Sequence, residues 1–166
     1  MLILKNNAYT ASVITVSDKG AAGLREDKSG PLAADMLEKL GFRVVKTEII
    51  PDDFDAIVKA LINHSDEGVN LVITSGGTGA SPRDNTPEAT MAVCEREIPG
   101  ISELMRFKGY NITPFAVLSR GRSVIRKGSL IINLPGNPKA VSENIDILQP
   151  VLWHAVKMLE GRDTEH

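Results

Sequence analysis

Apolar residues follow two alternating patterns along the chain. Short runs rich in valine and isoleucine predict buried strands, and they occur at residues 11–16, 42–50, 69–74 and 130–134. Between them, apolar residues three or four apart predict helices from Leu32 to Leu40 and from Phe54 to Ile62. Three strand–helix units in succession predict an α/β fold with a mostly parallel sheet and right-handed crossovers.

The second half of the chain predicts further elements. Helices are expected at residues 88–96 and 101–108, and strands at 115–119, 123–126 and 130–134. The last two strands are close enough to form a hairpin, which would add an antiparallel part to the sheet. A final helix carries apolar residues from Val141 to Leu159 and is expected to bend or split at Pro150. Residues 162–166 are expected to fray.

Capping residues predict where the helices begin. Ser29 is expected to cap the helix that contains Leu32, and either Asp52 or Asp53 the next one. Thr86 followed by Pro87 predicts a third start. The polar, glycine-rich segment 17–30 is long for a simple turn, so it is either a working loop or a mobile surface connection.

A glycine loop follows the strand at 69–74. Successive backbone N–H groups next to glycine can surround an anion. The loop lacks the lysine of a Walker motif, and Pro82 stands where a dinucleotide fingerprint needs a small residue. A simple tight turn is the alternative, but neighbouring hydroxyl groups favour phosphate binding. The candidate residues are Thr74, Ser75, Gly76, Gly77, Thr78 and Gly79.

Two aspartates follow the ends of strands that are expected to be neighbours. Asp52 and Asp84 could therefore converge on one Mg²⁺ ion, which would offset the repulsion between a carboxylate and a bound phosphate. Alternatively, Asp52 is only a helix cap and Asp84 only a loop charge. Arg83 could neutralise phosphate or pair with an acid.

A second sharp corner precedes the final helix and is another candidate anion site. It offers free N–H donors, an amide and a lysine, and it consists of Pro135, Gly136, Asn137, Pro138 and Lys139. A basic run that includes Arg120 lies shortly before it. Such a run is commonly a solvated surface, although a polyanionic ligand would use part of it.

Composition restricts the class of protein. The 166 residues are expected to form one domain, residues 1–166. A net charge of −2 and a pI near 5.9 argue against nucleic-acid binding. The single cysteine, Cys94, fits a reducing compartment. No apolar run reaches the length of about 18 residues that a membrane span needs, so we expect a cytoplasmic protein without a membrane contact.

Six motifs together resemble the molybdenum-cofactor biosynthesis family of Mog and MoaB proteins, which includes the G domain of gephyrin. They fall in order between residues 10 and 161, so the resemblance covers nearly the whole chain. The glycine loop with its Pro-Arg-Asp-x-Thr-Pro extension is the most specific part. The motifs are Ser17-Asp18-Lys19 with Gly23 and residues 27–30, Ile50-Pro51-Asp52, residues 74–79, residues 82–89, Leu118-Ser119-Arg120 and residues 133–139.

The resemblance implies a three-layer α/β/α sandwich, commonly a homotrimer, that binds molybdopterin. In the Mog branch it implies an adenylyltransferase. The molybdopterin phosphate attacks the α-phosphorus of ATP and pyrophosphate leaves. Residues matching Asp52 and Asp84 support Mg²⁺ and catalysis there. Ser119, Arg120 and the 135–139 corner are expected on the pterin side, and the downstream molybdenum insertase is an expected partner.

Two other functions compete with the adenylyltransferase. The MoaB branch of enteric bacteria keeps the fold but alters the Arg-Asp pattern after the glycine loop, so a non-catalytic molybdopterin-binding or scaffold module is the alternative. The intact pair Asp52 and Asp84 favours the enzyme. A nicotinamide oxidoreductase is disfavoured by Pro82 and by the lack of a suitably placed acid.

Overall fold

The computed structural model describes residues 9–161, so the fraying expected of residues 162–166 lies outside the described part. Within this range no helix is both long enough and apolar enough to cross a membrane. The elements are, in chain order, β1 (Thr10–Val16), α1 (Asp18–Ala21), α2 (Ser29–Lys39), β2 (Arg43–Ile50), α3 (Phe54–Asp66), β3 (Leu71–Ser75), α4 (Thr86–Ala92), β4 (Arg96–Glu97), α5 (Pro99–Tyr110), the 3₁₀ helix η1 (Pro114–Leu118), β5 (Ser123–Arg126), β6 (Ser129–Leu134) and α6 (Pro138–Leu159).

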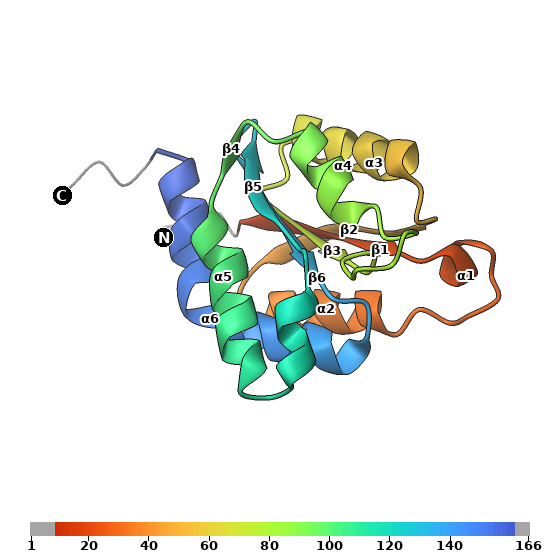
Figure 1. Cartoon of the computed structure of the whole chain (residues 1–166). Helices are drawn as coiled ribbons and strands as arrows, with labels where there is room; N and C mark the ends of the chain where they lie inside the picture. Colours follow the sequence, from red (N-terminus) through yellow and green to blue (C-terminus); the bar gives the residue numbers. More distant parts are fainter. Residues whose placement is uncertain (1–8, 162–166) are drawn as a thin grey trace.

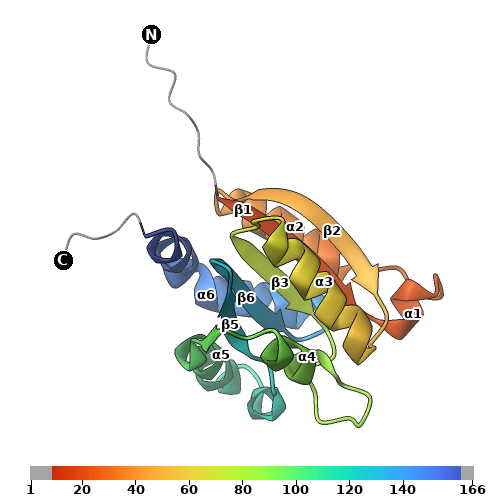
Figure 2. The same cartoon turned by 90° about the horizontal axis from the view of Figure 1, so that it is seen from above.

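One six-stranded sheet forms the middle layer, in the order β2-β1-β3-β6-β5-β4. The four adjacent strands β2, β1, β3 and β6 are parallel. Strand β5 pairs antiparallel with both β6 and β4. Helices α3 and α4 cover one face, and α2, α5 and α6 cover the other (Figures 1 and 2). The predicted α/β/α sandwich with a mostly parallel sheet and a β5–β6 hairpin is therefore confirmed.

The central strands are buried on both faces, which explains their continuous apolar runs. Ile14 and Val72 point to the core under α3 and α4. Their neighbours Val13 and Ile73 point to the opposite core, under α2 and α6. Because side chains alternate along a strand, an unbroken apolar run serves two cores at once.

The order of the strands places a crevice at one edge of the sheet. Strand β1 lies between β2 and β3. The chain therefore passes from β1 to β2 on one side of β1 and then crosses to β3 on its other side. The helices that make these two connections, α2 and α3, lie on opposite faces (Figure 2). In open parallel sheets, ligands bind at such a switch point, beyond the carboxyl ends of the strands.

The start of α2 differs from the prediction, and the start of α3 agrees with it. The carboxylate of Asp27, rather than the hydroxyl of Ser29, accepts the first N–H groups of α2, from Ser29 and Gly30 at 3.0 Å each. The Ser29 hydroxyl donates instead to the carbonyl oxygen of Gly136. For α3, the choice between two aspartates is settled in favour of Asp53, which accepts the N–H of Ala56 at 2.9 Å.

Two further element predictions were wrong, and the split of the final helix that was one of two expectations at Pro150 does not occur. Residues 115–119 do not form a strand; η1 occupies this segment, and its apolar side chains are mostly exposed. The helix expected at 88–96 is α4, which ends at Ala92 because the chain then enters the short edge strand β4. Helix α6 continues through Pro150 without a break.

His64 is a fully buried histidine held between two strands. Its Nδ1 lies 2.7 Å from the hydroxyl of Ser12 on β1, and its Nε2 lies 2.8 Å from a carboxylate oxygen of Glu48 on β2. Burial lowers the pKa of His64, although the neighbouring Glu48 carboxylate acts in the opposite direction. The imidazole therefore resists protonation in the folded protein.

We expect acid to destabilise the protein through His64. Since its folded pKa is lowered, the unfolded state binds more protons below the unfolded pKa of about 6.5. The free energy of unfolding should therefore decrease as the pH falls through this range. Thermal unfolding between about pH 7.5 and about pH 5.5 measures it, and His64→Gln should show a smaller pH dependence. An unchanged dependence in the variant would assign the effect to other groups.

Candidate active site

Two cavities lie side by side at the carboxyl edge of the sheet. The larger, about 700 Å³, opens beyond β1, β2 and β3, at the switch point, and we call it the acidic cavity. Its lining carries five carboxylates and three basic side chains, a formal excess of two negative charges. The predicted residues that line it are Asp52, Gly76, Gly77, Arg83, Asp84, Gly136, Asn137 and Pro138.

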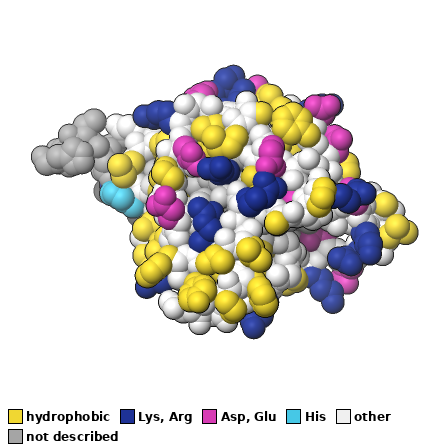
Figure 3. Space-filling view, viewed as in Figure 1, with side chains coloured by type: hydrophobic (Ala, Val, Ile, Leu, Met, Phe, Trp, Pro, Cys, Tyr) yellow, Lys and Arg dark blue, Asp and Glu magenta, His cyan; other side chains and the backbone are white. Residues whose placement is uncertain are grey.

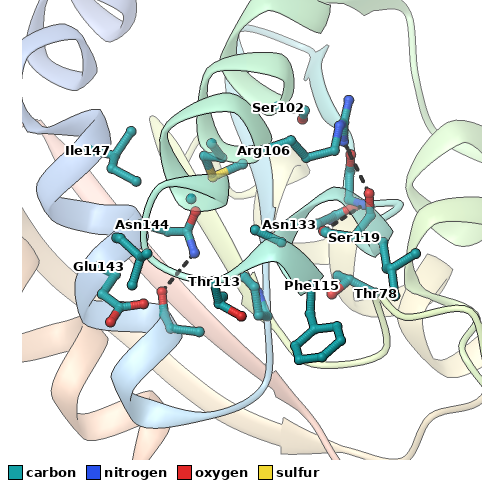
Figure 4. A pocket seen from close by; sticks show the side chains of 18 of the residues that line it. Thr78, Ser102, Arg106, Thr113, Phe115, Ser119, Asn133, Glu143, Asn144 and Ile147 are labelled. Atoms are coloured by element: carbon teal, nitrogen blue, oxygen red, sulfur yellow. Dashed lines mark hydrogen bonds between the residues drawn. The ribbon is translucent and has the colours of Figure 1, made fainter.

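The smaller cavity, about 260 Å³, lies among α5, η1, β6 and α6, and we call it the apolar cavity. Met105, Phe115 and Ile147 line it, together with polar groups such as those of Asn133 and Asn144 (Figure 4). An apolar wall with a few placed polar groups suits a planar ring. The predicted residues that line it are Thr78, Gly79, Ser119, Pro135 and Asn137.

The glycine loop separates the two cavities. Gly76 and Gly77 line the acidic cavity, whereas Thr78 and Gly79 line the apolar one. Asn137 borders both. A ligand in one cavity could therefore meet a ligand in the other at this loop.

Gly76 and Gly77 have positive φ angles of 105° and 67°, which side chains rarely adopt. A Cβ at Gly76 would lie 2.3 Å from the carbonyl oxygen of Val16. A Cβ at Gly77 would lie 2.3 Å from the Thr86 hydroxyl oxygen and 2.9 Å from an Asp52 carboxylate oxygen. These two positions therefore require glycine.

The hydroxyl residues around the loop differ in position. Thr74 and Ser75 are buried and line neither of the two cavities: the Thr74 oxygen accepts from Asn133, and the Ser75 hydroxyl donates to the Pro135 carbonyl. Thr86 is not the predicted cap of α4, because its hydroxyl donates to the Gly76 carbonyl at 2.9 Å. These hydrogen bonds fix the conformation of the glycine loop.

Three carboxylates gather at the acidic cavity. The Asp52 backbone N–H donates to Asp18 at 2.9 Å, and an Asp52 carboxylate oxygen accepts the N–H of Asn85 at 3.1 Å. Burial raises the pKa of Asp52; hydrogen bonds from Asn85 oppose this, and the negative charges of Asp84 and Asp18 add to it. Asp52 and Asp84 line the same cavity as predicted, with Asp18 as a third member. Their strands, β2 and β3, are not the neighbours that were expected, because β1 lies between them.

A divalent cation would relieve this repulsion. Within residues 9–161, no group of three or more His, Cys, Asp or Glu side chains could hold a metal ion by itself. Mg²⁺, however, is usually held by one or two carboxylates together with phosphate oxygens and water. The donor chemistry of Asp52 and Asp84 fits that arrangement.

Arg83 and residues 136–138 of the second corner also line the acidic cavity. The Arg83 guanidinium forms an ion pair with Asp18. Gly136 packs against the glycine loop, since a Cβ there would lie 3.2 Å from the Gly76 Cα. Asn137 caps α6 by accepting the N–H of Ala140 at 2.8 Å. The side chain of Lys139 is 83% exposed and lines neither cavity.

Arg120 forms hydrogen bonds that hold the glycine loop and the segment after it. Its guanidinium donates to the carbonyl oxygens of Gly79, at 2.8 Å, and Asp84, at 3.1 Å, and it pairs with Glu88. Its backbone N–H donates to the carbonyl of Thr78. The contact of Arg120 with the pterin stays a prediction, and the structure gives the side chain a second role in holding residues 78–84.

Arg120→Gln should loosen this loop. The shorter amide cannot reach both carbonyls and Glu88, so amide hydrogens of residues 79–85 should exchange about ten-fold faster. Hydrogen exchange read by mass spectrometry measures this, with β3 as the internal reference. Unchanged exchange in 79–85 would show that the loop holds its shape without Arg120.

Several residues of the site were missed as individual contributors. Asp18 and Asp27 lie on the segment after β1, which was predicted as a working loop or a surface connection and supplied a motif of the resemblance, but neither aspartate was given a role. Asn133 and Asn144 border the apolar cavity from β6 and α6 (Figure 4). A usable signal was present for Asp18, since it directly follows a strand that ends at the same sheet edge.

Glycine-rich strand ends around a cavity at the switch point define the class of α/β proteins that bind anionic ligands at the carboxyl edge of a parallel sheet. Comparison with known proteins gives the family. Residues 12–154 match the family described as "Probable molybdopterin binding domain", and the chain belongs to this molybdopterin-binding family of molybdenum cofactor biosynthesis.

Individual relatives agree with the family. The chain is 41% identical to a protein from Helicobacter pylori named molybdopterin adenylyltransferase, over 90% of this chain and 86% of that one. It is 40% identical to a protein of the same name from Escherichia coli K12, over 96% and 80%. The crystal structure of the molybdopterin biosynthesis enzyme MoaB from Thermus thermophilus superposes with a TM-score of 0.88 at 44% identity, over 92% of this chain and 97% of that one.

Proposed function

We propose that the protein is a molybdopterin adenylyltransferase that transfers AMP from ATP to the phosphate of molybdopterin. The observation that carries the proposal is the meeting of the glycine loop, Asp52 and Asp84 in one cavity at the switch point of the sheet. The names of the relatives at 40–41% identity support the same reaction.

The two cavities suggest how the substrates are placed. The triphosphate of ATP lies in the acidic cavity against Gly76 and Gly77, and the pterin lies in the apolar cavity near Ser119, Pro135 and Asn137. The molybdopterin phosphate then reaches the α-phosphorus from the other side of the glycine loop. A P–O bond to molybdopterin forms, the bond to the leaving pyrophosphate breaks, and adenylyl-molybdopterin results.

The residues act by position and charge. Because the substrate phosphate is itself the nucleophile, no side chain has to attack. The backbone N–H of Gly77 and the guanidinium of Arg83 stabilise the phosphate oxygens, whereas the Gly76 N–H already donates to the Leu134 carbonyl oxygen at 3.0 Å. Asp52 and Asp84 would hold Mg²⁺, and the ion would supply positive charge that offsets the negative charge of the phosphates. The excess of carboxylates in the lining supports this role for a cation.

The alternative, a binding-only module of the MoaB type, is less well supported. A module that only binds molybdopterin has no need for carboxylates that repel each other beside a glycine loop. The raised pKa of Asp52 shows that its ionised form is destabilised by burial and by its neighbours. A divalent cation bound at these carboxylates would offset this cost, which supports the enzyme over the binding-only module.

A release assay tests the proposed function. Purified protein should liberate pyrophosphate from ATP only when molybdopterin and Mg²⁺ are both present. Binding of molybdopterin without any pyrophosphate would support the binding-only module. Pyrophosphate release without molybdopterin would contradict the proposed acceptor.

We also infer that the protein assembles as a homotrimer. Large apolar side chains gather on the surface over α5 and η1 (Figure 3), where Phe107 and Phe115 are 71% and 74% exposed. Contiguous apolar surface of this kind is typical of contact sites between proteins. The cytoplasmic location and the molybdenum insertase as a downstream partner stay predictions.

A further inference from the structure

Asp18 links three loops at the acidic cavity. One of its carboxylate oxygens accepts the backbone N–H of Asp52 at 2.9 Å, and the other pairs with the Arg83 guanidinium. The two charged side chains are solvent-accessible, at 41% for Asp18 and 76% for Arg83. Arg83, a cation that we place on the triphosphate, is therefore already engaged by a carboxylate.

This pairing affects any anion that enters. For a triphosphate to use Arg83, the guanidinium has to leave Asp18 or be shared with it. The released carboxylate then stands beside the anion, in a lining that already has an excess of negative charge. A divalent cation bound with the nucleotide removes this penalty, because Asp18 then faces a positive charge as well.

We propose that Asp18 is a specificity-determining residue that restrains Arg83, so that the acidic cavity accepts ATP together with a divalent cation and disfavours metal-free ATP. The proposal rests on the proposed function, which places ATP in this cavity. It assigns Asp18 a task that neither Asp52 nor Asp84 performs, since neither of them pairs with Arg83 within the described residues.

Asp18→Asn separates this task from a structural one. Asparagine has nearly the same shape and keeps an oxygen for the Asp52 N–H, but it loses the charge that holds Arg83. An exposed ion pair contributes little to folding, so the melting temperature should stay close to that of the wild type. A change in ligand binding would then reflect the site and not the fold.

The test is calorimetric titration with ATP, once with Mg²⁺ and once with EDTA. Asp18→Asn should bind metal-free ATP about three- to ten-fold more tightly than the wild type, because Arg83 is free and one negative charge is gone. Binding with Mg²⁺ should change by less than about two-fold. The preference for the metal-bound nucleotide should therefore fall.

Two further variants test whether Asp18 affects ATP binding through Arg83. Glu26→Gln removes a charge of the same sign from the lining of the same cavity without changing the Asp18–Arg83 pair. It should tighten binding of metal-free ATP less than Asp18→Asn does. When Arg83→Gln is already present, adding Asp18→Asn should have only the small effect of Glu26→Gln, since no guanidinium is left to release.

The outcomes separate the two proposals. If Asp18→Asn and Glu26→Gln tighten binding equally, or if the effect of Asp18→Asn is the same with and without Arg83, Asp18 does not act through Arg83 and this inference falls. The same follows if the wild type binds ATP with Mg²⁺ and Asp18→Asn keeps the full metal preference. If the wild type binds no ATP even with Mg²⁺, the proposed function fails and this inference fails with it.

Discussion

Asp84→Ala should lower the rate of adenylyl transfer by about a thousand-fold or more, while the melting temperature changes by less than about 2 °C. The side chain lies in a loop at the acidic cavity, where it accepts one hydrogen bond, from the N–H of Ser81 at 3.0 Å. Its removal also relieves the repulsion that helps to raise the pKa of Asp52. Single-turnover kinetics and thermal unfolding measure the two effects.

Asp53→Ala is the matched control for this prediction. Asp53 lies next to Asp52 but points to the start of α3, where it accepts the Ala56 N–H. Its loss should cost about 1 kcal/mol of stability and leave turnover close to that of the wild type. Wild-type turnover in Asp84→Ala would remove Asp84 from the mechanism. A parallel loss of stability and activity in that variant would mark Asp84 as structural.

Gly77→Ala should abolish detectable ATP binding and lower the melting temperature. The added methyl group would lie 2.3 Å from the Thr86 oxygen and 2.9 Å from an Asp52 oxygen, at a φ of 67°. The loop would have to move away from Asp52, so the backbone donors would no longer face the phosphates. Gly77→Val, which we expect to fill the space of the phosphate, would add further displacement.

Gly23→Ala is a control that separates the effect of backbone strain at a positive φ from the effect of steric contact at Gly77. Gly23 has a similar φ of 72°, but a Cβ there would meet nothing within 4 Å. It should cost about 1 kcal/mol through its backbone angle and leave ATP affinity unchanged. Calorimetry on both variants measures the difference. ATP affinity at the wild-type level in Gly77→Ala would show that the phosphates do not depend on this part of the loop.

The sheet and its helices could be predicted because buried positions recur along strands and helices as a regular pattern of apolar residues. Strands β1, β3 and β6 are covered on both faces and read as continuous apolar runs, and α3 shows a clear stripe from Phe54 to Ile62. The error at η1 has the opposite cause. Phe115 and Leu118 are apolar but exposed, so the pattern there reflects surface chemistry and not a strand in the core.

The site was predictable in part. Asp52 and Asp84 follow β2 and β3, which are not neighbours as predicted, because β1 lies between them. The carboxyl ends of parallel strands still share one edge of the sheet, and both side chains line the same cavity there. The division of the glycine loop between two cavities leaves no trace in local sequence, because it depends on how α5, η1 and α6 pack. The engagement of Arg83 by Asp18 likewise joins residues 65 positions apart.

A crystal structure with Mg²⁺ and a non-hydrolysable ATP analogue tests the central claim most directly. We expect the phosphates to lie in the acidic cavity against Gly76 and Gly77, with one metal ion contacting both the nucleotide and the carboxylates of Asp52 and Asp84. A nucleotide bound elsewhere, or bound here with both aspartates away from any metal, would contradict the account.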